Sequence, residues 1–257
     1  MNQQRVYRTE GIVLRGYNYG EADRILTLFT PQAGKVRAIA KGVRRTKSRK
    51  SGHLDLFTRS AMLLARGRQL DIVTQAETIE SFRPARDDLW RSSWCHYVAE
   101  LVDGFTAEQL PNYPLYSLAV ATFRRLAQVD QVDMVVHAFE MQLLGATGYR
   151  PQLFRCLNCD NAIQAEANRF SSTMGGALCP NCVSADHAAS QISVNALKVL
   201  RHLQTDEEAM LHLPALPEDV RQEVARRLQE YITYRLESRP RSLAFLDRLR
   251  FENASLI

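Results

Sequence analysis

The sequence predicts an α+β protein of several domains, in which a β-rich first third precedes a helical body that contains a small cysteine-rich module. Three observations lead to this prediction. Short apolar runs fill the first eighty residues, apolar residues recur at helical spacing after Pro84, and four cysteines form two close pairs between positions 156 and 182. We expect domain segments at residues 1–82, 83–151, 152–190 and 191–257.

The first segment contains five runs that indicate short strands. They cover residues 6–17, 25–29, 35–43, 54–65 and 70–82. Gly11 and Gly16 indicate bends in the first run, Pro31 and Gly34 mark a turn, and the Arg-Gly-Arg sequence at 66–68 separates the last two runs. Five short strands in so short a segment are typical of a small closed barrel of the OB type, with an SH3-like barrel as the alternative.

Helical periodicity begins after Pro84. Apolar residues recur at three- and four-residue steps over 89–105, 115–126, 132–144, 197–203 and 220–236, with a Leu-Pro-Ala-Leu-Pro break at 213–217. Trp90, Trp94 and Tyr97 share one face of the first of these helices. Because this spacing is helical and carries no interleaved basic residue, we interpret the aromatic stripe, and Cys95 within it, as core.

The third segment contains the pattern Cys156-x2-Cys159-x19-Cys179-x2-Cys182. This spacing is typical of structural zinc sites with four thiolate ligands. Gly175 and Gly176 favour a hairpin that leads into the second pair. Four thiolates leave no open coordination position, so we predict one structural Zn²⁺ and no catalytic metal. An iron–sulfur cluster, a redox dithiol pair and a ligand role for His187 are the alternatives.

Positive charge is concentrated in the predicted barrel. Residues 24–54 contain nine lysine or arginine residues and no acidic residue, so this segment carries +9. The whole chain carries +5, which leaves −4 for the remainder. Lys35, Arg37 and Lys41 alternate with Val36, Ala38 and Ala40, which predicts a half-buried strand with a basic outer face.

A basic block on a slightly acidic body is typical of a surface that binds nucleic acid, although a solvated basic loop is the alternative. Tyr17 and Tyr19, flanked by glycines, are the aromatic residues of this domain that we expect to be exposed for base stacking, whereas Phe29 and Phe57 fit the core. The predicted nucleic-acid contacts are Lys35, Arg37, Lys41, Arg44, Arg45, Lys47, Arg49, Lys50, Arg66 and Arg68.

The composition and the motifs that the sequence lacks exclude several classes of protein. The 257 residues are 46% hydrophobic and 24% charged, as in globular proteins, and no apolar run is long enough for a membrane span. The first sixteen residues lack the apolar core of a signal peptide, so we expect a cytoplasmic protein without a membrane partner. The chain has no P-loop, no KxDG, no HExxH and no acidic cluster for catalytic Mg²⁺, which predicts a protein that is not an enzyme. Glu21 and Asp23 beside Arg24 are interpreted as a local ion pair or turn.

Particular residue strings resemble the RecO family of bacterial DNA repair proteins, in its zinc-bearing branch. The N-terminal strings are the most specific, and the resemblance extends over nearly the whole chain. These strings are GIVLR (11–15), YGEADRILT (19–27), GK (34–35), AKGVRR (40–45), QAE (75–77) with Phe82, Tyr149 with Pro151, both cysteine pairs, and RSLAFL (241–246).

The resemblance implies a recombination mediator made of an OB barrel, a helical body and an inserted zinc module. It implies binding to single- and double-stranded DNA (ssDNA and dsDNA), annealing of complementary strands, and cooperation with RecR in loading RecA onto DNA coated by single-strand-binding protein (SSB). It also implies a contact between the helical body and the C-terminal tail of SSB. The family's basic barrel surface corresponds here to residues 35–50. An RNA-binding barrel and zinc protein without a repair role, and a nuclease or nucleotidyl transferase, are the competing hypotheses.

Overall fold

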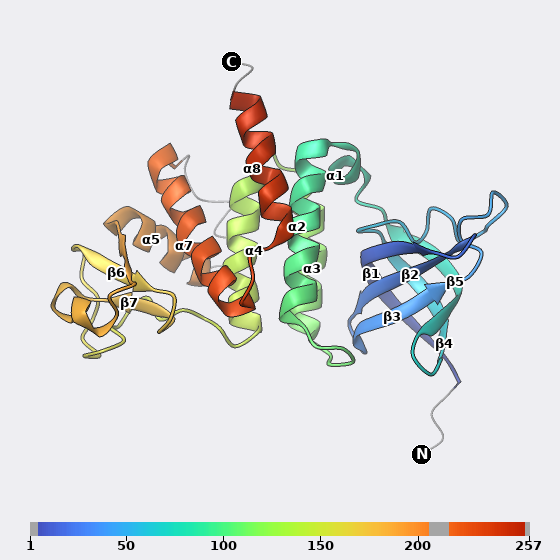
Figure 1. Ribbon diagram of the computed structural model, residues 1–257, viewed down its shortest axis with the longest axis horizontal. Coiled ribbons are helices and arrows are strands. Elements are labelled where there is room, and N and C mark those ends of the chain that lie inside the picture. The colour runs from blue at the N-terminus through green and yellow to red at the C-terminus, as the bar shows by residue number, and fades with distance from the viewer. Residues whose placement is uncertain (1–4, 206–215, 255–257) are drawn as a thin grey trace. The chain divides into compact units, whose positions relative to one another are not determined.

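The computed structural model describes residues 5–205 and 216–254, and the side chains of all but 251–254 within those ranges. The described residues form two compact units (Figure 1). One contains the residues up to Val132 and those from Arg241 onward, and the other contains those from Asp133 to Pro240. Most of the Leu-Pro-Ala-Leu-Pro break lies outside the described residues. No helix among those described is long and apolar enough to span a membrane.

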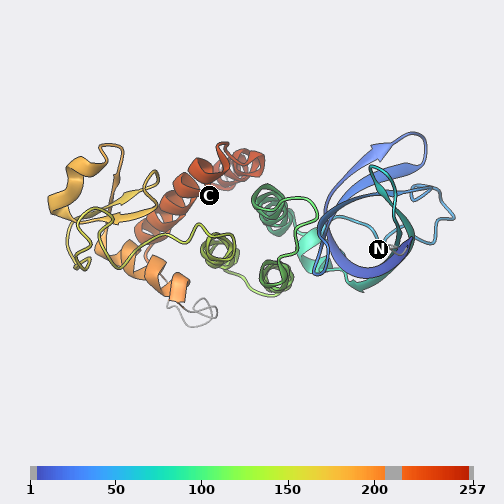
Figure 2. The same cartoon turned by 90° about the horizontal axis from the view of Figure 1, so that it is seen from below.

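Five strands close into a barrel at the start of the chain, as predicted. They are β1 (Val6–Tyr19), β2 (Asp23–Thr30), β3 (Gly34–Ala40), β4 (Arg59–Ala65) and β5 (Asp71–Glu80). Their order is β1-β2-β3-β5-β4, and pairing between β1 and β4 closes the ring (Figure 2). Only the short β3–β5 contact is parallel. This arrangement confirms a barrel of the OB type.

The interior of the barrel is apolar. Val13, Leu26, Leu28, Ala38 and Leu64 are buried in one cluster, and each large aliphatic side chain that leaves water there stabilises the fold by about 1.5–3 kcal/mol. β1 has an irregularity between Val13 and Arg15, where the strand bends. Gly11 serves close packing, because a Cβ atom at this position would lie 3.0 Å from the carbonyl oxygen of Phe29.

Two predicted strand boundaries were wrong. The third strand ends at Ala40, because Gly42 adopts φ 64° and its amide donates to Asp23 Oδ1 over 2.7 Å, which turns the chain. Residues 54–58 precede β4 as a turn rather than a strand, with Phe57 at φ 64°. Leu54 and Phe57 are nevertheless buried, so these residues contribute core side chains from a loop.

Four helices belong to the same unit as the barrel. They are α1 (Arg83–Asp87), α2 (Leu89–Phe105), α3 (Tyr113–Leu126) and α8 (Arg241–Ala254). Asp88 caps α2 by accepting from the Arg91 amide over 2.7 Å. Trp94, Cys95 and Tyr97 are fully buried, which confirms the core prediction for these three, whereas Trp90 is only half-buried. Burial raises the pKa of the Cys95 thiol to about 12. The helix α8 was not predicted.

The second unit combines helices with a three-stranded sheet. Its helices are α4 (Val132–Ala146), α5 (Val194–Thr205) and α7 (Glu218–Leu236). Its strands are β6 (Asn168–Ser171), β7 (Gly176–Leu178) and β8 (Ser190–Ile192), in the order β7-β6-β8, and the 3₁₀ helix η1 (Pro180–Ala185) follows β7. β6 and β7 form the hairpin that the two glycines predict.

Candidate nucleic-acid interface and metal centre

The loop between β3 and β4 positions the densest group of cations. Its first part is fixed by backbone hydrogen bonds from Arg44 N to Ala22 O (2.9 Å) and from Ser48 N to Arg45 O (2.9 Å). Val43 and Leu54 are buried at its two ends. Because apolar side chains and turn hydrogen bonds hold the loop against the barrel, the intervening cationic side chains project into solvent. We refer to residues 41–50 as the cationic loop.

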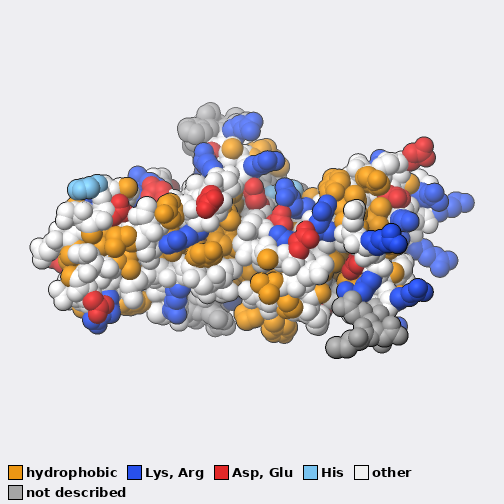
Figure 3. Space-filling view, turned by 60° about the horizontal axis from the view of Figure 1, so that its bottom comes forward, with side chains coloured by type: hydrophobic (Ala, Val, Ile, Leu, Met, Phe, Trp, Pro, Cys, Tyr) orange, Lys and Arg blue, Asp and Glu red, His pale blue; other side chains and the backbone are white. Residues whose placement is uncertain are grey.

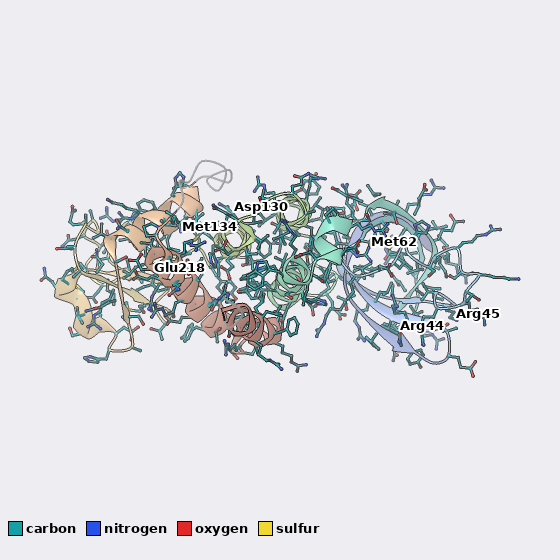
Figure 4. The ribbon with its side chains drawn as sticks, turned by 90° about the horizontal axis from the view of Figure 1, so that it is seen from above. Arg44, Arg45, Met62, Asp130, Met134 and Glu218 are labelled. Carbon is teal, nitrogen blue, oxygen red and sulfur yellow. The ribbon has the colours of Figure 1, made fainter. Side chains whose placement is uncertain are left out.

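Five side chains of the cationic loop are exposed and have no carboxylate within 4.0 Å among the described residues. Arg44 and Arg45 are labelled in Figure 4, and the space-filling view shows lysine and arginine side chains gathered over the barrel (Figure 3). The Arg44 guanidinium donates to the Gly20 carbonyl over 3.3 Å. The five are Lys41, Arg44, Arg45, Lys47 and Arg49.

Two predicted contact residues are instead engaged within the protein. Lys35 Nζ lies 3.0 Å from Asp103 Oδ1 and 2.7 Å from the Asp103 carbonyl oxygen, and its side chain is only 13% exposed. Lys50 Nζ donates to the Val73 carbonyl over 3.0 Å. Burial lowers the pKa of Lys50. Both amino groups therefore have less freedom to meet a phosphate than the five exposed cations.

The remaining three predicted contacts, Arg37, Arg66 and Arg68, line one groove on the barrel. This groove has a volume of about 510 Å³ and is also lined by Tyr7 and Lys35. The Arg66 guanidinium lies 4.7 Å from the centre of the Tyr7 ring, which holds it by a cation–π contact. All three arginines are exposed. With Lys35 they outnumber the two carboxylates of the groove, those of Asp71 and Glu108.

The aromatic residues of the barrel are exposed or buried as the sequence predicts. Tyr17 and Tyr19 are 51% and 55% exposed, whereas Phe29 and Phe57 are buried.

The sequence did not identify Asp103 as the partner of both Arg15 and Lys35. Asp103 lies on α2, far from the barrel strands in sequence, and no local pattern connects it with them.

The four predicted cysteine ligands meet at one point in the second unit. All four Sγ atoms lie within 4.8 Å of one another, and Cys159 Sγ is 3.8 Å from Cys179 Sγ. Among the described residues this group of candidate metal ligands includes no histidine, so His187 is not part of it. Three of the four cysteines are buried and Cys159 is exposed.

Backbone contacts bring the two cysteine pairs together. Asp160, at φ 59°, donates from its amide to the Cys156 carbonyl over 2.9 Å, and Cys182 N donates to Cys179 O over 3.0 Å. Leu157 N donates to Ala177 O over 3.0 Å, which ties the first pair to β7. A Cβ at Gly176 would lie 2.2 Å from Gln152 O, so glycine is needed where these segments cross.

The surroundings of the sulfur atoms suit a bound cation. Asn158 Nδ2 donates to Cys182 Sγ over 3.3 Å, and the Cys179 amide donates to Cys156 Sγ over 3.4 Å. Burial opposes ionisation of Cys156, but the amides of Cys159, Cys179 and Asn158 outweigh it and lower the pKa of this thiol to about 6. Burial and the neighbouring thiols instead raise the pKa of Cys179, so in the absence of a cation the four sulfur atoms do not all favour the thiolate form. Four sulfur ligands within 4.8 Å of one another can hold a metal ion, whose positive charge favours the thiolates.

The chain is similar to known proteins over almost its full length. The family model "Recombination protein O N terminal" matches residues 1–82, and "Recombination protein O C terminal" matches residues 86–244. A protein from Roseiflexus sp. (strain RS-1) is 42% identical over 248 residues, which are 96% of this chain and 87% of that protein. One from Dehalococcoides mccartyi (strain 195) is 37% identical over 253 residues, or 98% and 100% of the two chains. Both relatives are named DNA repair protein RecO.

Proposed function

Because the chain belongs to the RecO family, whose role is in DNA repair and recombination, we propose that it is a DNA-binding recombination mediator without catalytic activity. It binds ssDNA and dsDNA through the barrel and anneals complementary strands. With RecR it helps to load RecA onto ssDNA coated by SSB, and it contacts the SSB C-terminal tail. Its place of action is the cytoplasm, at the nucleoid.

One observation carries this proposal: the cationic loop exposes five side chains that no carboxylate neutralises among the described residues. Phosphate binding by such side chains releases counterions and is largely independent of sequence. Annealing requires a protein that holds two strands by charge and releases them after pairing. A surface of exposed arginine and lysine side chains meets this requirement without any bond chemistry.

Both cation groups of the barrel contribute in this proposal. Lys41, Arg44, Arg45, Lys47 and Arg49 form the main phosphate contacts, and Arg37, Arg66 and Arg68 extend the surface. Lys50 adds to the local positive potential from a half-buried position, and Lys35 contributes less because Asp103 partly neutralises it. The surface therefore combines freely exposed charges with charges that are held in place.

The four cysteines hold one Zn²⁺ in this proposal, and its role is structural. Thiolate ligands favour zinc, and a complete set of four protein ligands leaves no position for water. Bound zinc would cross-link the first cysteine pair, Cys156 and Cys159, to the second pair, Cys179 and Cys182. The chain's own residues join these pairs to β7, so the metal stabilises the short sheet of the second unit.

An annealing assay with SSB-coated complementary oligonucleotides tests the function. We expect annealing without nucleotide and without magnesium, and we expect the triple variant R44A/R45A/K47A to lose most of it. Its affinity for ssDNA and dsDNA should fall together, with a salt dependence less steep by about two to three phosphate contacts. Three results would contradict the proposal. They are an unchanged DNA affinity of the variant, magnesium-dependent cleavage of DNA, and equal affinity for single-stranded RNA and ssDNA without binding to SSB.

A further inference from the structure

The outer face of β1, β2 and β3 carries two rows of side chains, of which the function above uses only Arg37. Cross-strand pairing aligns Arg15 with Thr27 and Thr27 with Arg37. The neighbouring row aligns Tyr17 with Ile25 and Ile25 with Ile39. Directly paired residues project to the same side of a sheet, so each row forms a strip across the three strands. A cationic strip therefore runs beside an apolar and aromatic strip.

The cationic strip and Tyr17 line an open groove of about 560 Å³, whereas Ile25 is buried. Two carboxylates, those of Asp103 and Glu108, also line this groove. Tyr17 is 51% exposed, and all residues of β1 from Arg15 to Tyr19 are exposed, so this ring is not a core residue. Arg37 Nη2 donates to Tyr17 Oη over 3.4 Å, which places the guanidinium beside the ring. An exposed ring with an adjacent cation on a barrel face is suited to a nucleobase and its phosphate.

The positively charged side chains of the groove differ in how free they are to contact a phosphate. Asp103 lies 2.8 Å from the Arg15 guanidinium and 3.0 Å from Lys35 Nζ, so it partly neutralises both. Arg37 has no carboxylate within 4.0 Å among the described residues. Beyond Tyr17, β1 continues to Tyr19, which pairs with Asp23, and β3 continues into Lys41 of the cationic loop. The face is therefore continuous with the proposed phosphate surface.

We propose that this face is a subsite selective for single strands, in which an unpaired base stacks on Tyr17 while Arg37 contacts the adjacent phosphate. The inference rests on the proposed DNA binding and adds a distinction between single strands and duplexes, which phosphate charge alone cannot make. The cationic loop contacts phosphates, which a duplex and a single strand both present. Tyr17 needs a base face, which is buried by stacking in a duplex and accessible in an unpaired strand.

The test compares three ligands with the full-length protein: oligo-dT, an abasic oligonucleotide of the same length, and a blunt duplex. We expect Tyr17→Leu to weaken oligo-dT binding roughly 10-fold, the range that loss of one stacked base produces, while duplex and abasic affinities change less than about 2-fold. Tyr17→Phe should restore oligo-dT binding. The salt dependence should be the same in the Tyr17→Leu variant as in the natural protein, because no phosphate contact is removed.

Tyr113→Leu is the matched control, because Tyr113 is 65% exposed but lies at the start of α3 rather than on the barrel. The inference is overturned if Tyr17→Leu leaves oligo-dT affinity unchanged, or if it lowers duplex and abasic affinities by the same factor. Either result leaves the proposed function standing as long as the R44A/R45A/K47A variant still loses DNA. Retained DNA binding in that variant would instead overturn the function itself.

Discussion

Two lysines of the cationic loop lie in different surroundings although they are close in sequence. Lys47 is exposed. Lys50 is half-buried, its Nζ donates to the Val73 carbonyl over 3.0 Å, and burial lowers its pKa. The sequence presents both as equivalent members of a basic run. Only the folded loop shows which amino group is available to a phosphate and which one braces the loop against β5.

The same substitution at these two positions should therefore have different effects. We expect Lys47→Ala to weaken DNA binding a few-fold for every sequence and to lower the salt slope by about one, with an unchanged melting temperature. Lys50→Ala should lower the melting temperature and leave the salt slope nearly intact. Salt titrations and thermal melts of both variants make the comparison. Equal loss of DNA affinity at the two positions would contradict this division of roles.

At the level of single residues, sequence predicted best where the chemistry is local. The four cysteines were identifiable because each pair forms a compact turn, and the structure brings their sulfur atoms within 4.8 Å. The pairing of Lys35 with Asp103 was not identifiable, because it depends on where α2 meets the barrel. The strip of Tyr17, Ile25 and Ile39 likewise depends on the register of three strands.

Among the elements, α8 shows how one side chain can fix a helix that lies far away in sequence. Glu100 on α2 accepts from the amides of Arg241 and Ser242 over 2.8 and 2.9 Å, and from the Ser242 hydroxyl. These are the unsatisfied N–H groups of a helix start. Burial opposes ionisation of Glu100, but the hydrogen bonds from Ser242 and Arg241 outweigh it and lower the pKa of this carboxyl.

A lowered pKa means that the folded protein favours the carboxylate. Its contribution to stability is therefore complete above the ordinary glutamate pKa of 4.5 and is lost as the pH falls through the lower pKa of the folded state. We expect Glu100→Gln to destabilise the first unit by about 1 kcal/mol at pH 7 and by less at acid pH. Urea unfolding at both pH values measures this. A difference that stays constant with pH would exclude the capping carboxylate as its source.

The elements that sequence predicted are those with strong periodicity of their own. The helices α2, α3, α4, α5 and α7 each place apolar residues on one face, and the five barrel runs are separated by clear turn residues. The helix α8 was missed because its start depends on Glu100 rather than on a local cap, although Pro240 was a usable signal for a helix start. Residues 54–58 were assigned to a strand because buried loop residues have the same apolar composition.

At the level of the whole molecule, the two proposed sites belong to different compact units. The cationic loop lies in the unit that contains the barrel, and the cysteine cluster lies between Asp133 and Pro240. The chain leaves the first unit after Val132 and returns to it at Arg241. Loss of structure in the second unit would therefore turn it into one long loop between α3 and α8. The entropic cost of closing a loop grows only slowly with its length, so α8 can remain docked through Glu100.

Metal removal should accordingly separate the two sites. We expect chelation, or Cys179→Ser, to release the metal and to expose backbone amides of β6, β7 and β8 to hydrogen exchange. The affinity of the barrel for a DNA duplex should change less than about 3-fold, because the cationic loop and its anchoring residues lie outside the second unit. Cys95→Ala is the matched control, since it removes a buried thiol outside the cluster and should leave the metal content unchanged. If the amides of the three strands stay equally protected from exchange after metal loss, the sheet does not depend on the metal. If duplex binding is lost together with the metal, the two units do not behave independently.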